Sequence, residues 1–384
     1  MRSAPKACAN SFSLNFNGLW HQNAVPLFDG NPAGWLLNRG KLRKLTTAKG
    51  AGGAAPEQDG GVPMKAIVSH AFAPLDELKY EDVADPVATG RQVVIKVEAA
   101  GVNYPDGLLV QGLYQSKPPH PFTPGMEVAG TVESVGPDVT RLKVGERVAT
   151  VCTLGGYAEK VLEDESRVFP IGEMDGGDAC ALLVAYGTSH HALKQRAALK
   201  AGETLCVLGA AGATGIAAVQ IGKVMGARVI AVCSTEEKRK LALEGGADEA
   251  IGYDNLKDDL KALTDGKGVD VVYDVVGGEA FNACSRSMAR NGRLLIIGFA
   301  SGEIPKFPVN LSLVKEYAVV GVFWGNFTRF EPEVYADNMK ELIGWYAAGK
   351  VKPLIEGRYP LADAAEVLKR VLGRGATGKL VLVP

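Results

Sequence analysis

The hydrophobic pattern changes along the chain, and its first regular stretch begins at Met64. Short runs of alternating apolar and polar residues, broken by glycine and proline, occur at residues 64–70, 91–102, 127–136, 146–151 and 157–163. A period of two interrupted by turn residues is typical of half-buried, mostly antiparallel strands. We therefore expect a β-rich, barrel-like unit over residues 64–186.

A second pattern covers residues 187–325. Strongly apolar strands are expected at 204–210, 228–234, 248–253, 269–277 and 292–300, with helical segments between them. This alternation is typical of a parallel α/β sheet. Residues 326–384 contain two amphipathic helices and a closing strand, too few elements for a third domain, so we expect them to return to the first unit.

The first 63 residues differ from the rest. They hold broken apolar pieces and end in a glycine-rich linker, and in their first 50 residues Asp29 is the only acid among many basic residues. A basic, acid-poor start is compatible with a mitochondrial transit peptide, but no clean amphipathic period is present. We favour a loosely ordered tail.

Composition limits the classes of function. The chain has 384 residues, 42 Lys and Arg against 43 Asp and Glu, and a net charge of -1, which gives no sign of a nucleic-acid or membrane partner. No apolar run approaches the length of a membrane helix. The six cysteines stand far apart, so we expect free thiols in a reducing, cytoplasmic compartment, with a mitochondrial location as the alternative.

The segment from Leu205 to Ser234 carries the most chemical information. An apolar strand runs into Gly209-Ala210-Ala211-Gly212-Ala213-Thr214-Gly215, then a helix-compatible stretch and a second strand follow. This is the context of a dinucleotide-binding turn, in which glycines allow close approach of the pyrophosphate and of the helix to the strand. Ala210 replaces the first glycine of the usual pattern. We expect Ala210, Gly212, Ala213, Thr214 and Gly215 to bind the cofactor.

The end of the second strand bears on the choice of cofactor. NAD sites usually place an acid there to hold the ribose hydroxyls, but this strand ends in Cys233 and Ser234. Ser234 and Thr235 can hydrogen-bond a phosphate, and Lys238 can neutralise it. These residues favour NADPH, although a solvated helix start containing Glu236 and Glu237 would look similar.

These features together resemble the medium-chain dehydrogenase/reductase superfamily. The stretches "AAGVNYPDGLLVQGLYQ", "PFTPGMEVAG", "GRLLIIGFASG" and "VVGVFWG" are similar to its zinc-free quinone oxidoreductases, the zeta-crystallin-like branch. The resemblance covers Met64 to Pro384. It implies a Rossmann-type doubly wound parallel sheet domain plus a GroES-like, mostly antiparallel β-barrel catalytic domain, and a homodimer.

The resemblance also implies that no metal is bound. Where zinc alcohol dehydrogenases carry ligands, this chain has Asn103 and Met126, and the third position falls at or near Ala185. An amide, a thioether and a methyl group cannot form the tetrahedral nitrogen and sulfur site that zinc requires. The segment that would hold a structural zinc has only Cys152, and the five histidines show no ligand spacing.

Several residues are expected in a substrate cleft. Glu127 lies at the start of an apolar strand, and either forms part of the active-site floor or pairs with a nearby Arg or backbone N–H. By resemblance, Asn103 and Asp106 line the cleft, with Asn103 able to bond a substrate carbonyl. For Asp106 we favour a helix cap. Tyr104 could stack on a flat ring.

Tyr114 is the candidate proton donor. Related enoyl-thioester reductases carry a tyrosine at the matching position, and a phenol is protonated at neutral pH. The alternative is a half-buried tyrosine with its hydroxyl in solvent. By resemblance, Thr188 meets the nicotinamide and Tyr253 the adenosine phosphate end. Phe299 and Phe323 either approach the nicotinamide or belong to the core.

The sequence therefore predicts an NADPH-dependent, zinc-independent oxidoreductase that transfers hydride to quinones or related α,β-unsaturated carbonyls. Acceptors that are already electrophilic suit a site without a metal, because the nicotinamide supplies the hydride. Two alternatives remain open: an enoyl-CoA or other enoyl-thioester reductase, with Lys117 and Arg329 available for the phosphates, and a non-catalytic NADPH-binding protein.

Overall fold

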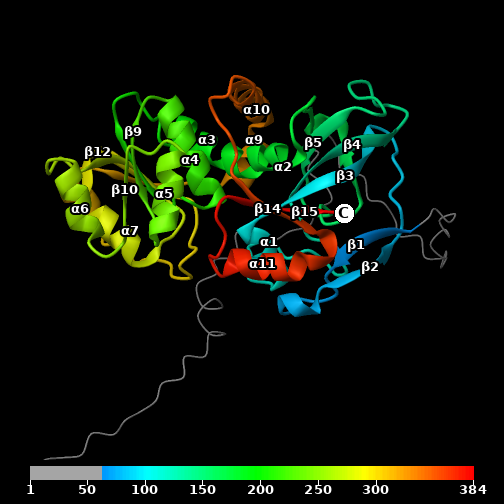
Figure 1. The fold of residues 1–384 in the computed structure, drawn as a ribbon, viewed down its shortest axis with the longest axis horizontal. Helices are drawn as coiled ribbons and strands as arrows, with labels where there is room; N and C mark the ends of the chain where they lie inside the picture. The colour runs from blue at the N-terminus through cyan, green and yellow to red at the C-terminus, as the bar shows by residue number, and fades with distance from the viewer. Residues whose placement is uncertain (1–62) are drawn as a thin grey trace, which may run out of the picture. The chain divides into compact units, whose positions relative to one another are not determined.

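The computed structural model describes residues 63–384, and the predicted extension over residues 1–63 lies outside the described residues apart from Pro63. The described chain forms two large sheets, a two-stranded hairpin and a set of helices (Figure 1). Within residues 63–384, no helix has the length and apolar character needed to cross a membrane.

The first large sheet has seven strands. Its order is β14-β15-β3-β4-β5-β7, with β6 paired to β3, and every pairing is antiparallel except that of β14 with β15. The end strands β14 and β7 do not pair with each other, so the expected barrel-like unit is mostly antiparallel but is not a closed barrel. The strands, with the β1–β2 hairpin, are β1 Met64–Val68, β2 Lys79–Val83, β3 Gln92–Val102, β4 Glu127–Val135, β5 Arg147–Val151, β6 Lys160–Asp164, β7 Val168–Pro170, β14 Ile355–Pro360 and β15 Lys379–Val383.

The second large sheet has six parallel strands in the order β10-β9-β8-β11-β12-β13. The strand order reverses direction between β8 and β11, which confirms the predicted doubly wound sheet and marks the point where such sheets bind ligands. Its elements are β8 Thr204–Leu208, α4 Ala213–Val224, β9 Arg228–Val232, α5 Glu236–Glu244, β10 Glu249–Ile251, α6 Leu256–Leu263, β11 Val269–Asp274, α7 Gly278–Ser285, β12 Met288–Ile296, α8 Asn310–Lys315 and β13 Ala318–Gly321.

Helical segments connect the two sheets. A continuous run of helical backbone includes α2 (Gly176–Ala181), Leu182–Tyr186, α3 (Gly187–His191) and Ala192–Arg196, with wide π-type turns in the second and fourth parts. α10 (Pro332–Ala347) packs against α3 and against α9 (Trp324–Phe330). α1 (Tyr104–Val110) packs against α11 (Ala364–Leu372). Short 3₁₀ turns lie at Leu75–Glu77, Glu165–Arg167 and Leu361–Asp363.

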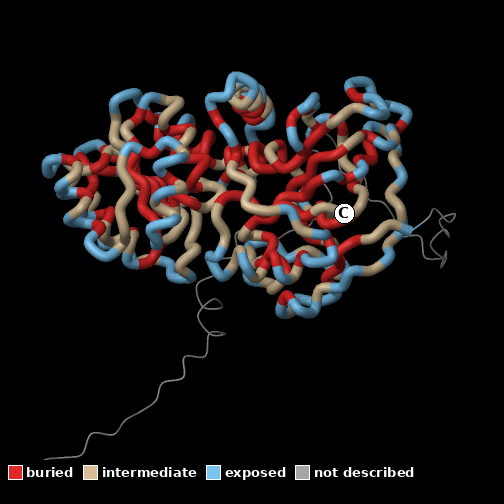
Figure 2. Tube along the Cα trace, viewed as in Figure 1, coloured by how far each residue is buried: buried red, intermediate tan, exposed pale blue. Residues whose placement is uncertain are grey.

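The burial of the strands follows the sequence pattern (Figure 2). In the middle of β3, exposed Lys96 and Glu98 alternate with buried Val97 and Ala99, as expected for a sheet with one solvated face. Four consecutive residues of β8, Leu205–Leu208, are all fully buried, because helices cover both faces of a parallel sheet.

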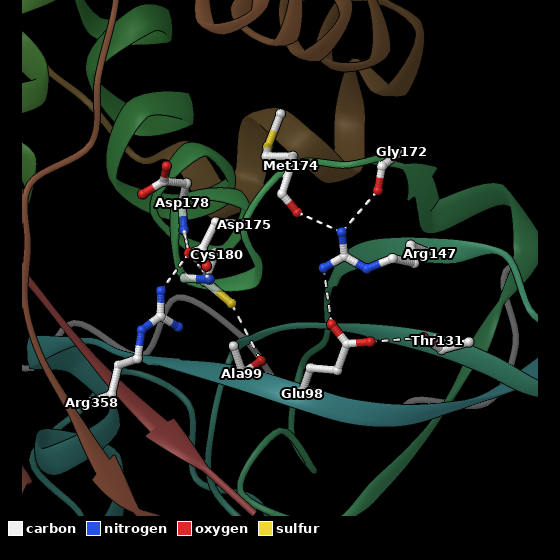
Figure 3. A network of polar contacts seen from close by, with 11 residues as sticks. Glu98, Ala99, Thr131, Arg147, Gly172, Met174, Asp175, Asp178, Cys180 and Arg358 are labelled. Atoms are coloured by element: carbon white, nitrogen blue, oxygen red, sulfur yellow. Dashed lines mark hydrogen bonds and ion pairs between the residues drawn. The ribbon is translucent and has the colours of Figure 1, made fainter.

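A polar network fixes the start of the long helical run against the first sheet (Figure 3). Arg147 on β5 donates to Glu98 on β3 at 2.9 Å, and Glu98 also accepts from the Thr131 hydroxyl at 2.8 Å. The Asp175 carboxylate caps α2 by accepting from two backbone N–H groups, and Arg358 on β14 pairs with it. This helical run carries Val184 and Thr188 into the cleft described next.

Candidate active site

One cleft of about 1840 Å³ lies along the carboxyl ends of β8, β9 and β11 and extends over the first sheet. We divide its lining into two halves. The glycine-turn half comprises lining residues between 209 and 301 and between 371 and 380. The aromatic half comprises lining residues between 102 and 169 and between 322 and 336. Val184, Ala185 and Thr188 line the cleft between the halves.

The glycine turn forms the end of β8. Gly209 has a φ of +66°, a conformation that favours glycine, and Gly212 is the N-cap of α4. A Cβ on Gly215 would collide with the Gly209 carbonyl oxygen and lie 2.8 Å from the Ala210 Cα, so α4 packs directly on the end of the strand. A Cβ on Gly212 would meet a single atom within 4 Å, the Gly209 oxygen at 3.4 Å. The turn therefore leaves open the space that a pyrophosphate would occupy.

The end of β9 carries no acid in the cleft lining, which includes Cys233, Ser234 and Lys238. The Thr235 hydroxyl caps α5 by accepting from the Lys238 N–H at 3.2 Å. The Lys238 ammonium donates to the Arg374 carbonyl oxygen at 2.9 Å, which brings the C-terminal segment beside the turn. Arg374 itself lines the cleft, so basic groups from two distant segments meet here.

Tyr253, two residues after the end of β10, supports the turn. Its hydroxyl accepts from the Gly209 N–H at 2.9 Å and approaches the Val232 carbonyl oxygen at 3.4 Å. The Gly378 N–H donates to the Ala211 oxygen at 2.8 Å, which ties the segment before β15 to the same turn. The turn is thus held by Tyr253 on one side and by the segment before β15 on the other.

The aromatic half is lined by rings from several parts of the chain. α1 and the loop after it supply two of these rings, and the others come from β7 and from the segment around α9 and α10. The rings that line this half are Tyr104, Tyr114, Phe169, Phe323, Trp324 and Tyr335. Six aromatic side chains around one space suit a planar, conjugated ligand.

A buried ionic network lies beneath this half. Glu127 on β4 and Lys379 on β15 form an ion pair with exposed fractions of 0% and 1%. Lys379 also donates to the Asn103 side-chain oxygen at 2.8 Å, and the Asn103 amide donates to Glu127 at 3.1 Å. The other Glu127 oxygen accepts from the Val184 N–H at 3.0 Å. Glu127 therefore pairs with both a cation and a backbone N–H group, and the cation is a lysine in place of the expected arginine.

Asp106 is a second buried carboxylate in the same region. One of its oxygens accepts from the Asn103 N–H at 2.9 Å and from the Tyr157 hydroxyl at 2.8 Å, which completes the N-terminal cap of α1. Its other oxygen has no partner within the described residues. Burial raises the pKa of Asp106 to about 7. Burial, and then the charge of Asp106, raise the pKa of Tyr114, so the Tyr114 phenol is protonated at neutral pH.

Most of the predicted site residues converge on the cleft. Its lining includes Asn103, Tyr104, Tyr114, Thr188, Gly212, Ala213, Thr214, Gly215, Ser234, Lys238, Tyr253 and Phe323. The residues that were predicted for the site but do not line the cleft are Asp106, Glu127, Ala210, Thr235 and Phe299.

The positions where a zinc enzyme would have ligands, Asn103, Met126 and Ala185, lie at the cleft surface. Within residues 63–384, no three His, Cys, Asp or Glu side chains are grouped to hold a metal ion.

Several residues in or beneath the cleft were not predicted from the sequence. Lys379 lies in a strand pattern that predicts simply a core strand. Arg374, Arg167 and Tyr335 come from segments whose position depends on the tertiary fold. A lysine within the otherwise apolar "GKLVLVP" was the one available signal, since a buried lysine requires a partner.

Known proteins share this arrangement. The family model described as zinc-binding dehydrogenase matches residues 213–342, and the alcohol dehydrogenase GroES-like domain matches residues 89–173. A quinone oxidoreductase-like protein 2 homolog from Nematostella vectensis is 39% identical over 297 residues, which cover 76% of this chain and 81% of the relative.

Two solved structures, each named as complexed with NADPH, are also similar. Mycobacterial Rv1454c has a TM-score of 0.78 at 32% identity, covering 84% of this chain and 100% of that chain. Escherichia coli quinone oxidoreductase has a TM-score of 0.77 at 26% identity, covering 83% and 100%.

A doubly wound nucleotide-binding sheet joined to a GroES-like unit defines a medium-chain dehydrogenase/reductase, an oxidoreductase class. Within that superfamily, the chain belongs to the quinone oxidoreductase branch. The predicted fold class, family and enzyme class are thereby confirmed.

Proposed function

We propose that this protein is an NADPH-dependent, zinc-independent reductase of quinones or related α,β-unsaturated carbonyls. The observation that carries the proposal is that one continuous cleft joins a glycine turn suited to a pyrophosphate to a wall of aromatic rings. When bound there, NADPH would supply a hydride. The chain positions the reactants and excludes water.

NADPH is favoured over NADH by the groups at the end of β9. Ser234, Lys238 and Arg374 line the cleft there, and a 2′-phosphate fits a hydroxyl and two cations better than a pair of ribose hydroxyls does. The complexes of Rv1454c and of the Escherichia coli enzyme with NADPH support the same choice.

The variant Lys238→Glu tests the cofactor. It should raise the Michaelis constant for NADPH by about tenfold or more, a loss of about 1.4 kcal/mol, and change that for NADH far less. Lys240→Glu, on the same helix but 78% exposed, is the control for added negative charge. Equal effects of Lys238→Glu on both cofactors would remove the argument for the 2′-phosphate.

The zinc-independent chemistry rests on the residues at the usual ligand positions. The Asn103 side-chain oxygen accepts a hydrogen bond from Lys379, and its amide nitrogen donates one to Glu127. These two bonds fix the orientation of the Asn103 side chain, which suits it to position the reactants. Reduction then needs an acceptor that is electrophilic without a Lewis acid. Tyr114 supplies the proton that follows hydride addition in an enone, because its hydroxyl remains protonated and its ring lines the cleft.

The principal alternative is an enoyl-thioester reductase, which would use the same cofactor and the same tyrosine. It is tested by following NADPH oxidation with 9,10-phenanthrenequinone and, separately, with crotonyl-CoA. Quinone-dependent turnover with little thioester activity is expected, and Tyr114→Phe should slow reduction of an enone by about tenfold. The reverse preference would assign the thioester reaction. Cofactor binding with neither activity would leave a non-catalytic binding protein.

The assembly is proposed to be a homodimer in the cytoplasm. β13 is an edge strand of the parallel sheet, and the adjacent α8 has no buried residue. Val309, Leu313 and Val314 are each at least 70% exposed beside that edge. An edge strand flanked by exposed apolar side chains is the kind of surface that a second copy covers. A monomer in light scattering at micromolar concentration would contradict this assembly.

A further inference from the structure

The two halves of the cleft carry different charges. The glycine-turn half includes Asp254, Asp258 and Glu279 in its lining, together with basic residues. The aromatic half has Arg167 and Arg329 and, among the described residues, no carboxylate. Binding of a neutral quinone does not require two guanidinium groups, so their presence in the lining suggests a ligand with negative charge.

Arg167 is held in position by its own neighbours. It lies at the end of the turn before β7, where one of its terminal nitrogens donates to the Val151 carbonyl oxygen at 2.8 Å. The other terminal nitrogen forms an ion pair with Glu163 at 3.3 Å, and Glu163 does not line the cleft. The remaining N–H groups of this fork have no partner within residues 63–384. The Arg167 guanidinium is therefore held in one orientation and still has N–H groups that can donate to a ligand.

Arg329 contributes from the opposite segment. It lies in the last turn of α9, is exposed, and has no carboxylate within 4 Å among the described residues. Its guanidinium carbon lies 5.8 Å from the centre of the Phe330 ring. An exposed arginine that lines a cleft without an ion-pair partner is available to an anionic ligand.

Two buried donors belong to the same wall. The Tyr335 hydroxyl and the Trp324 indole N–H have no hydrogen-bond partner in the described part of the chain, although both side chains are only 9% exposed. The two rings pack edge to face at 5.7 Å, and both line the cleft. Buried donors without acceptors are rare in folded proteins and point to a partner supplied by a ligand or water.

We propose that the acceptor reduced in this cleft carries an anionic oxygen group, a carboxylate or a phosphate, which binds Arg167 and Arg329. Guanidinium groups match the geometry of both anions and form charge-assisted hydrogen bonds with them. The rings of the aromatic half would hold the planar part of the same molecule. This inference rests on the proposed reductase function and identifies the chemical class of its substrate.

The first test measures binding without turnover. Phenanthrene-2-carboxylate and phenanthrene-2-carboxamide cannot be reduced, and each is titrated calorimetrically into the full chain in the presence of NADP⁺. The carboxylate should bind roughly fivefold tighter at low salt, and Arg329→Gln should remove this preference. Arg290→Gln, which changes an exposed arginine outside the cleft lining, should keep it.

Equal binding of the two ligands would overturn the proposal, as would a preference that survives unchanged in both Arg329→Gln and Arg167→Gln. Because this measurement needs no reduction, it gives its answer even if quinone reduction itself is not observed. Failure of the anion site and failure of the proposed function are therefore distinguishable.

The second test identifies the source of the anion. NADPH oxidation is measured with 9,10-phenanthrenequinone-2-carboxylate against its carboxamide, and with crotonyl-CoA against crotonyl-pantetheine, which lacks the nucleotide phosphates. A selective loss in Arg329→Gln for the first charged acceptor supports a carboxylate, and for the second a phosphate. The same proportional loss on both members of each pair would overturn the proposal.

Discussion

The glycine-turn half of the cleft is built around the backbone of one short turn, Gly209 to Gly215, whereas the aromatic half has no such central segment and is formed by side chains from segments far apart in sequence. In the first half, Gly209 and Gly215 allow close approach of backbone to backbone. In the second, Asn103 at the cleft surface and the buried Glu127 and Lys379 connect the start of α1 with β4 and β15. The glycine-turn half thus depends mainly on residues that are close in sequence, and the aromatic half depends on tertiary packing.

This comparison predicts that the two halves fail in different ways when a key residue is changed. Loss of the ionic network should affect the stability of the fold more than cofactor binding. Loss of a turn glycine should affect cofactor binding more than the fold.

The largest effect is expected for Lys379→Met. The change leaves the Glu127 carboxylate buried without its cation, which costs about 3–5 kcal/mol and should lower the melting temperature by roughly 5 °C in a chain of this size. Differential scanning calorimetry measures the loss. Lys369→Met is the control, because Lys369 forms partly exposed ion pairs with Asp76 and Glu366 whose removal should cost below about 1 kcal/mol.

The double variant Glu127→Gln/Lys379→Met sharpens this result. Removing both charges also removes the unpaired carboxylate, so the double variant should melt above Lys379→Met alone. If the double variant were no more stable, the loss would be due to packing of the lysine stem rather than to the charge.

A smaller effect, dependent on pH, is expected for Asp106→Asn. The folded Asp106 keeps its proton up to about pH 7, whereas the unfolded carboxyl loses it near pH 4, so the folded state holds more protons between these values. The contribution of Asp106 to stability therefore falls as the pH rises from 4 to 7 and is constant above that range, a change of up to about 4 kcal/mol. Asparagine cannot titrate, so the melting temperature of the variant relative to wild type should rise over the same interval. A difference that is independent of pH would contradict the raised pKa.

The smallest change in free energy is expected for Gly215→Ala. The added Cβ would meet the Gly209 carbonyl, so the turn must shift, and the dissociation constant for NADPH should rise by about tenfold, or about 1.4 kcal/mol. Fluorescence titration of NADPH measures it. Gly344→Ala in α10 is the control, since its Cβ would meet nothing within 4 Å and should stabilise the helix slightly. If Gly215→Ala lowered the melting temperature as much as Lys379→Met, the separation of the two halves would fail.

The same contrast explains how much could be predicted from the sequence. The parallel strands and the turn from Gly209 to Gly215 could be predicted because each depends on neighbouring residues, with periodicity and glycine spacing visible in one segment. The open form of the seven-stranded sheet could not, since alternation predicts strands but not whether the end strands pair.

The site shows the same division. Ser234, Lys238 and Tyr114 were predicted from motifs, and they line the cleft. The partner of Glu127 was not identified, because Lys379 is 252 positions later in the sequence and β15 reaches β4 through β3. Arg374 was missed for the same reason.

The most direct test of the account is the initial rate of NADPH oxidation with 9,10-phenanthrenequinone before and after dialysis of the purified protein against a zinc chelator. The account predicts the same rate in both samples, because Asn103, Met126 and Ala185 offer no metal site and the acceptor is already electrophilic. A rate that falls with the chelator and returns when zinc is added would contradict it.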